Sequence, residues 1–289
     1  MDNVITSPRK SLRGRRKAWL RRRLMLGIAL TVLCINGLAM LVQMQTASLQ
    51  NSAWTTGYLL IGCLFFLAAY NLRKKLSFLP QLGTSRLWMQ LHIYVALISI
   101  AIFVAHVGLR VPYGSFEQLL ACLYLIVAGS GVYGLYVTRT VPKKLSAVNS
   151  EVIFEQIPQR KQELIVRARR LVLESARSTD VLARFYVNHL AHFLEKPRSL
   201  AYQVSPSLRR SKQLVADIEG LDRYLSEPQR GTSRQLTKLV RAKEDLDYHW
   251  ALQGKLKIWL FVHVGLTYSL LIVAVLHGLM AHAFGGGLR

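Results

Sequence analysis

Four histidines with a repeated spacing are the residues of this chain most able to do chemistry. Two lie in the apolar stretch 89–109 and two in the apolar stretch 257–284: His92, His106, His263 and His277. The members of each pair are fourteen residues apart. In an α-helix they therefore share one face and lie about 21 Å apart along the axis, at about 1.5 Å per residue. Imidazole can ligate a metal or transfer a proton near neutral pH, and the matched spacing favours one shared role.

Three roles compete for these imidazoles. Hydrogen bonding between helices is common for a single histidine in an apolar helix. A proton relay normally includes carboxylates, but the apolar stretches contain none apart from Glu117 at an edge. Zinc and copper need further good ligands beyond two imidazoles. Paired imidazoles on facing helices are, by contrast, the axial ligands of b-type haem in helical bundles, which is the role that the spacing favours.

The cysteines point away from other metal chemistry. Cys34, Cys63 and Cys122 all lie in apolar stretches and form no CxxC or CxxCH motif. Disulfides, structural zinc and covalently attached haem are therefore not expected.

The composition is typical of a membrane protein. The 289 residues are 52% hydrophobic, yet they carry a formal net charge of +23. Apolar spans separated by basic loops combine these two properties. We therefore predict an all-α integral membrane bundle of five transmembrane helices, at 24–42, 54–72, 89–109, 118–137 and 257–284.

The distribution of basic residues predicts the domains and the orientation. We expect a basic arm over 1–23, four spans within 24–137, a helical insert over 138–256, the fifth span and an outer tail over 285–289. The arm, the loop before the third span and the insert are basic, whereas the alternate loops are not. The positive-inside rule then places the N-terminus and the insert in the cytoplasm and the C-terminus outside. We expect the bacterial inner (cell) membrane.

The insert reads as helical, with helices over 159–175, 179–195 and 207–226 and another that begins near Thr232 and runs into the last span. It has no GxGxxG motif or P-loop, so we expect no nucleotide site there. The basic arm lacks interleaved aromatic residues beyond Trp19, so membrane lipid is the expected partner and nucleic acid is not.

The third and fifth spans both run from the cytoplasm outward and are therefore parallel. His92 and His263 each follow a basic residue by six positions, which places them at similar depth near the cytoplasmic face. His106 and His277 then meet near the outer face. Arg110 could hold propionates of the outer haem and Arg86 those of the inner haem.

The paired H-x13-H pattern resembles the di-haem transmembrane core of ferric reductases and NADPH oxidases, and also membrane b cytochromes that exchange electrons with quinols. The resemblance implies two non-covalent haems b, one held by His92 with His263 and the other by His106 with His277. It covers the five spans and not the insert. The chain departs from the oxidase pattern because no flavin- or nicotinamide-binding domain follows the last span. A redox partner protein or quinol is therefore expected to supply electrons.

The function predicted from these features is transmembrane electron transfer through two stacked bis-histidine haems, so that any enzymatic role would be that of an oxidoreductase component. Two alternatives stay open. One is a quinol- or quinone-reacting cytochrome b subunit of a larger respiratory complex. The other is a non-redox membrane scaffold or sensor that acts through the basic insert.

Overall fold

The computed structural model describes residues 8–48, 52–75, 84–148, 152–176, 180–207 and 209–284, and all regular structure in these ranges is helical. The prediction of an all-α chain is confirmed at this level. The chain divides into two compact units, residues 1–131 with 262–289 and residues 132–261. The helices are α1 Pro8–Ala47, α2 Ser52–Lys75, α3 Ser85–Val107, α4 Ser115–Leu145, α5 Ile157–Ala176, α6 Asp180–Phe185, α7 Ala191–Glu195, α8 Leu200–Val204, α9 Arg209–Leu221 and α10 Glu227–Phe284.

Three short turns complete the second unit: 3₁₀ turns at Phe154–Gln156 and Asp222–Tyr224, and a π-helical turn at Tyr186–Leu190 that joins α6 to α7. Helices α4 and α10 contribute residues to both units. Residues 1–7 of the predicted arm and the predicted tail 285–289 lie outside the described residues.

Within the described ranges, five helices are long and apolar enough to cross a membrane. Four of them contain a predicted stretch completely, and α3 contains 89–107 of the predicted stretch 89–109. Large apolar side chains on these helices are exposed, including Leu33 at 68% and Ile272 at 70%. Exposed apolar surface of this extent is unfavourable in water, so the helices indicate contact with membrane lipid.

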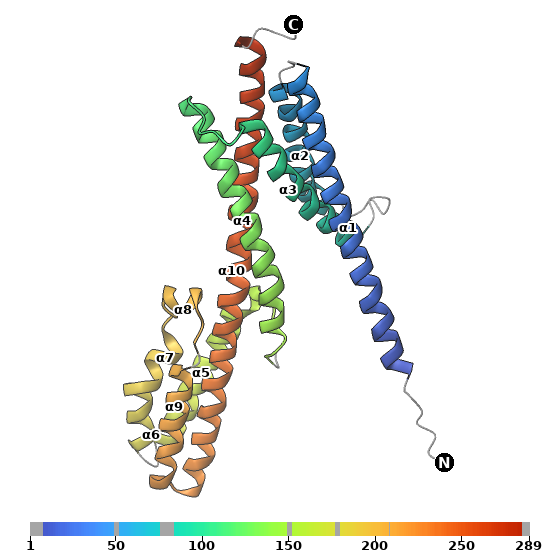
Figure 1. Cartoon of the computed structure of the whole chain (residues 1–289). Helices are drawn as coiled ribbons and strands as arrows, with labels where there is room; N and C mark the ends of the chain where they lie inside the picture. Colours follow the sequence, from blue (N-terminus) through green and yellow to red (C-terminus); the bar gives the residue numbers. More distant parts are fainter. Residues whose placement is uncertain are drawn as a thin grey trace, which may run out of the picture. The chain divides into compact units, whose positions relative to one another are not determined.

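Helix α10 begins five residues before the predicted position near Thr232 and continues without a break to Phe284 (Figure 1). Its start is a capping box, in which the Ser226 amide donates to Oε1 of Gln229 at 2.9 Å. Pro228 lies in the first turn, where its missing N–H needs no helical partner. The S-E-P-Q sequence at 226–229 therefore begins this helix.

Helix α4 also extends beyond its predicted end at 137, through Pro142, to Leu145. Proline in a helix interior removes one backbone hydrogen bond. Val137 and Val141 are buried against Leu252 of α10 in this region, and their burial offsets that loss.

In the first unit, α2, α3, α4 and the end of α10 share an apolar core centred on Leu64, Tyr124 and Leu270. Phe103 of α3 stacks on Tyr124, with ring centroids 4.1 Å apart. Helix α1 lies so close to α3 that a Cβ added at Gly27 would overlap the Tyr94 side chain. These contacts place α2, α3, α4 and α10 around one interior.

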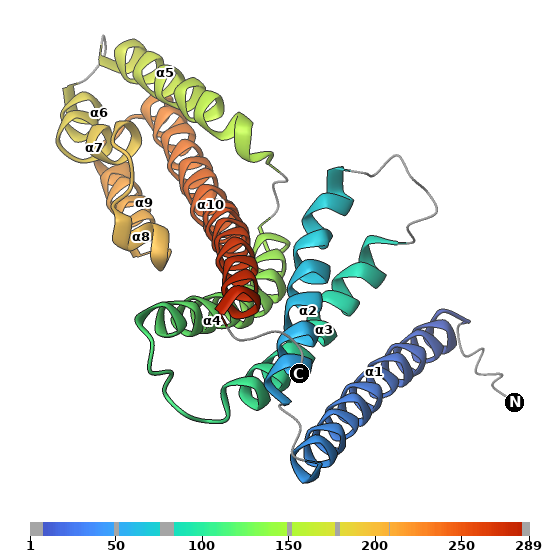
Figure 2. The ribbon, with the colours of Figure 1, turned by 90° about the horizontal axis from the view of Figure 1, so that it is seen from above.

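In the second unit, α5, α7 and α9 gather around the N-terminal part of α10 (Figure 2). The core of this unit consists of buried apolar side chains from these helices, from α6, from the π-helical turn and from the segment between α9 and α10. Its members are Ala168, Val172, Leu182, Tyr186, Leu190, Phe193, Leu194, Leu214, Ile218, Leu225, Leu236, Leu239 and Val240. These side chains form one contiguous core for the second unit.

Candidate functional site: a histidine-lined cavity

The first unit contains a cavity of about 690 Å³ that is lined by both His106 and His277. Its walls are mostly apolar and come from the beginnings of α2 and α4 and from the ends of α3 and α10. Helix α3 and the end of α10 therefore run in the same direction, as the proposed pairing of their histidines requires. A volume of 300 to 1,000 Å³ is usual for small-molecule and cofactor sites, on the order of this cavity.

The His106 imidazole is held by a threonine on the neighbouring helix. Its Nδ1 lies 3.0 Å from Oγ1 of Thr56, which is fully buried in the first turns of α2. The imidazole also makes a hydrogen bond with the backbone of Ala53, one turn earlier. Gly57 lies directly beside this ring, since a Cβ added there would approach His106 Cε1 to 3.2 Å.

The partners of Thr56 decide which nitrogen of His106 carries the proton. The Thr56 hydroxyl is 2.8 Å from the carbonyl of Ser52, and a carbonyl can only accept. The Thr56 hydroxyl has one proton and donates it to the Ser52 carbonyl. Its oxygen can then only accept from His106, so this hydrogen-bond network assigns the proton to Nδ1 of His106. Nε2 is then the unprotonated nitrogen, which is the form of imidazole that ligates iron.

His263 shows the same arrangement on another pair of helices. Its Nδ1 lies 2.6 Å from Oγ of Ser130 on α4, and that hydroxyl donates to the Val127 carbonyl at 2.8 Å. By the same argument, Nδ1 carries the proton and Nε2 does not. Gly131, next to Ser130, gives the ring room, since a Cβ there would lie 3.6 Å from His263 Cε1.

The described contacts of His92 lead to a different neighbour. Its ring lies against Tyr70 of α2, with centroids 5.2 Å apart. The structure thus brings His106 and His277 to one cavity, while the known contacts of His92 and His263 go to α2 and α4 respectively. The pairing of His92 with His263 stays a prediction.

The arginines predicted to face propionates differ in position. Arg110 lines the cavity with His106 and His277. Arg86 is exposed in the first turn of α3, six residues before His92. Lys257, which could also serve an inner haem from its sequence position, forms an ion pair with Glu155 in the second unit.

His282 also lines this cavity, but both of its ring nitrogens already have partners. Nδ1 lies 2.7 Å from the Gly278 carbonyl and Nε2 lies 2.5 Å from the Tyr58 hydroxyl. Trp54 contacts the same ring edge-on, with centroids 4.9 Å apart. These contacts give His282 a polar role at the cavity wall.

The sequence prediction missed Thr56 and Ser130, the two hydroxyls that orient the imidazoles. A signal for Thr56 was present. It lies near the start of one apolar stretch and His106 near the end of the next, so an antiparallel hairpin places them at equal depth. Ser130 had no comparable signal, because α4 and α10 are far apart in the sequence.

The residues at the cavity fit a haem. No cluster of three or more His, Cys, Asp or Glu side chains suited to a metal ion occurs in the ranges that the structure describes. A bis-histidine haem needs only two protein ligands, since the porphyrin supplies the others. The cavity offers an apolar wall, the hydrogen-bonded imidazole of His106, a second imidazole at His277 and the cationic Arg110, which are the kinds of group that such a haem would use.

Comparison of the whole chain with protein-family models, with curated proteins and with solved structures finds no match. The case for a redox site therefore depends on the spacing of the histidines and on the geometry around them.

Proposed function

We propose that this protein is a transmembrane b-type cytochrome that moves electrons between the two faces of a membrane. His106 and His277 hold one haem, and His92 and His263 hold a second haem at another depth. Bound haem supplies reversible one-electron transfer at its iron. The chain's own side chains fix the iron ligands, exclude water with apolar walls and provide Arg110 for a propionate.

The observation that carries this proposal is the shared cavity of His106 and His277, together with the hydrogen bond between Nδ1 of His106 and Thr56. Histidine ligands of metals usually donate their second ring N–H to a partner that fixes the ring and raises its basicity. Thr56 is placed to accept that proton, and Ser130 is placed to do so for His263. Two imidazoles in different helices share this arrangement, which simple helix packing does not require.

In this proposal the five long apolar helices all cross the membrane. The basic N-terminal arm and the helical region around 138–256 lie in the cytoplasm, and the end of α10 faces outward. Electrons come from a redox partner protein or from quinol. Anionic lipid attracts the basic arm.

Haem content of the purified protein tests the proposal directly. The reduced-minus-oxidised spectrum is expected to show the α-band of bis-histidine haem b, and pyridine haemochrome analysis is expected to give two haems per chain. His106→Ala and His277→Ala each remove the same haem, and His263→Ala removes the other. His189→Ala is the matched control, because His189 is exposed in the second unit. This variant is expected to retain both haems. Well-folded protein without colour would end the redox proposal and leave the scaffold or sensor role.

A hydrogen-bonded pair in the cavity wall favours quinol as the electron donor. Tyr58 and His282 lie 2.5 Å apart and line the same cavity as His106. Quinol oxidation releases protons, and a phenol–imidazole pair can accept and pass them on. Tyr58→Phe and His282→Gln are then expected to slow haem reduction by a soluble quinol while leaving the dithionite-reduced spectrum intact. An unchanged quinol rate in both variants would point to a partner protein instead.

A further inference from the structure

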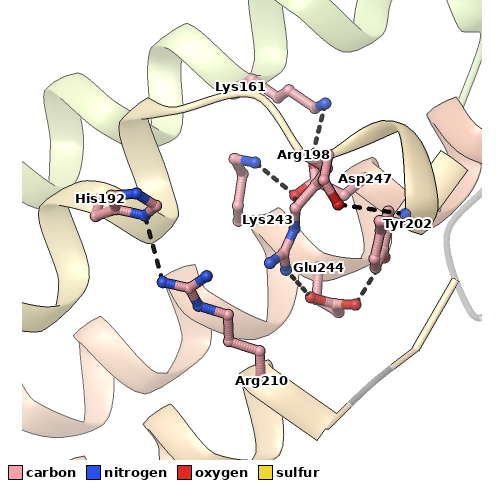
Figure 3. A network of polar contacts seen from close by, with 9 residues as sticks. Lys161, His192, Arg198, Tyr202, Arg210, Lys243, Glu244 and Asp247 are labelled. Carbon is pink, nitrogen blue, oxygen red and sulfur yellow. Dashed lines mark hydrogen bonds and ion pairs between the residues drawn. The ribbon is translucent and has the colours of Figure 1, made fainter.

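The second unit contains a charged cavity that has no part in the proposed haem sites. It measures about 340 Å³ and lies among α5, α8, α10 and the segment 196–199. Figure 3 shows three of its cationic side chains, those of Lys161, Arg198 and Lys243, converging on Asp247. The cationic side chains in the wall are Lys161, Lys196, Arg198 and Lys243.

One carboxylate serves three of these cations. Asp247 of α10 lies 2.6 Å from Lys161 Nζ, 2.9 Å from Arg198 Nε and 2.5 Å from Lys243 Nζ. Its side chain is fully buried, and that of Lys243 is 3% exposed. A single negative charge balances one of these three positive charges, so the contacts around Asp247 leave an excess of cation.

Arg198 is held rigidly by further contacts. It forms an ion pair with Glu244, which also accepts the Tyr202 hydroxyl at 2.7 Å. Its guanidinium lies between the rings of Phe193 and Tyr202, 4.2 and 4.8 Å from their centroids. These contacts fix the arginine before any ligand arrives, which is the usual condition for tight binding.

The charges of the cavity do not balance. Glu195 also lines it, but Arg169 neutralises this carboxylate at 2.8 Å. Lys161, Arg198 and Lys243 then face two carboxylates, Asp247 and the Arg198 partner Glu244, which leaves one positive charge in excess inside the cavity. Lys196, exposed at the rim, adds a second. A network that served only to join helices would be more stable if neutral, because burying uncompensated charge is unfavourable.

The pKa of Lys243 agrees with this excess of positive charge. Burial lowers the pKa of its ammonium group despite Asp247, and the nearby Lys161 and Arg198 lower it further. For Asp247, burial opposes ionisation, but Lys243 and Lys161 hold the pKa of the carboxyl below its usual range. The aspartate therefore gains from three cations, while Lys161 and Lys243 share this one carboxylate with Arg198.

We propose that this cavity binds the dianionic phosphate group of a phosphate monoester. Such a group carries a charge of about −1.5 to −2 at pH 7 and three strong acceptor oxygens, which matches the two uncompensated cations. Lys161 and Lys243 each have three N–H groups and use one on Asp247, so each has further donors to offer a phosphate oxygen. Trp250 and Tyr202 in the wall provide aromatic surface for the organic part. A soluble phosphorylated molecule and the headgroup of phosphatidate share this chemistry.

Calorimetric titration of the full-length protein in neutral detergent with inorganic phosphate tests the site. Wild type is expected to bind one phosphate saturably. Lys196→Gln is expected to weaken that binding about tenfold, the effect of losing one charged hydrogen bond. Because Lys196 is exposed at the cavity rim, the Lys196→Gln protein should unfold at the same temperature as wild type. Lys212→Gln is the matched control, because Lys212 is equally exposed on α9 outside the cavity.

Reconstitution distinguishes the two sources of phosphate. In phosphatidylcholine vesicles the protein should bind inorganic phosphate as in detergent. If phosphatidate is the ligand, its headgroup occupies the site at Lys196, so adding it to the vesicles suppresses the binding of inorganic phosphate. If the ligand is soluble, added phosphatidate leaves phosphate binding unchanged. Absence of saturable phosphate binding in wild type, or equal weakening by Lys196→Gln and Lys212→Gln, would overturn the proposal. None of these measurements depends on haem.

Discussion

Replacing Thr56 by valine tests the assignment of the proton on His106. Valine keeps the shape of threonine and removes the hydroxyl that accepts Nδ1–H at 3.0 Å. One neutral hydrogen bond contributes about 0.5 to 1.5 kcal/mol net, and loss of an outer partner of a metal ligand typically costs about 10- to 100-fold in affinity. At about 1.4 kcal/mol per tenfold, the expected loss at the outer haem is about 1 to 3 kcal/mol.

The same change has a predicted sign on the reduction potential. Without an acceptor for Nδ1–H, His106 becomes a weaker base, which destabilises ferric iron more than ferrous iron. The outer haem should therefore become easier to reduce, by tens of millivolts, since about 59 mV corresponds to a tenfold change for one electron. Potentiometric titration with optical detection measures both haems in one experiment.

Thr46→Val is the matched control for this experiment. Thr46 makes the same bonds to preceding carbonyls, with Val42 and Gln43, and is exposed on α1. The mirror experiment is Ser130→Ala, which should shift the other haem through His263. Thr46→Val should retain both haems with unchanged reduction potentials. If Thr56→Val does the same, the hydrogen bond from Nδ1–H of His106 to Thr56 does not support a haem ligand.

Three further outcomes are expected. Gly57→Leu places a side chain where a Cβ already approaches His106 to 3.2 Å, so it should remove one haem while helix content by circular dichroism stays normal; two retained haems would contradict the site. Leu190→Ala, at a fully buried position, should lower the free energy of unfolding of the second unit by about 2 to 5 kcal/mol in denaturant titrations, and an effect below about 1 kcal/mol would show that this core is loosely formed. Folding lowers the pKa of the Asp247 carboxyl below the value of about 3.9 that it has in the unfolded chain. The ionised carboxylate therefore stabilises the folded unit above about pH 3.9, and this stabilisation is lost as the pH falls through the pKa of the folded state. Asp247→Asn should therefore destabilise the unit by about 3 to 5 kcal/mol at pH 7 and weaken its acid sensitivity, and equal acid profiles for variant and wild type would refute this account.

Helix positions were largely readable from the sequence, because apolar stretches of spanning length can satisfy their backbone groups only as helices. The third predicted span, 89–109, falls almost wholly within α3. Boundaries were less predictable where local and tertiary effects compete. Pro142 reads as a helix end, yet burial of Val137 and Val141 carries α4 past it.

The sequence also identified the four histidines, because a spacing repeated in two stretches is visible without any structure. It could not identify Thr56 and Ser130 as their partners, since helices distant in the chain bring these hydroxyls to the rings. It likewise gave no sign that Asp247 gathers three cations from different elements. Residue type and period are local properties of the chain, whereas the protonated nitrogen of an imidazole and the charge balance of a cavity depend on neighbours that only the tertiary fold supplies.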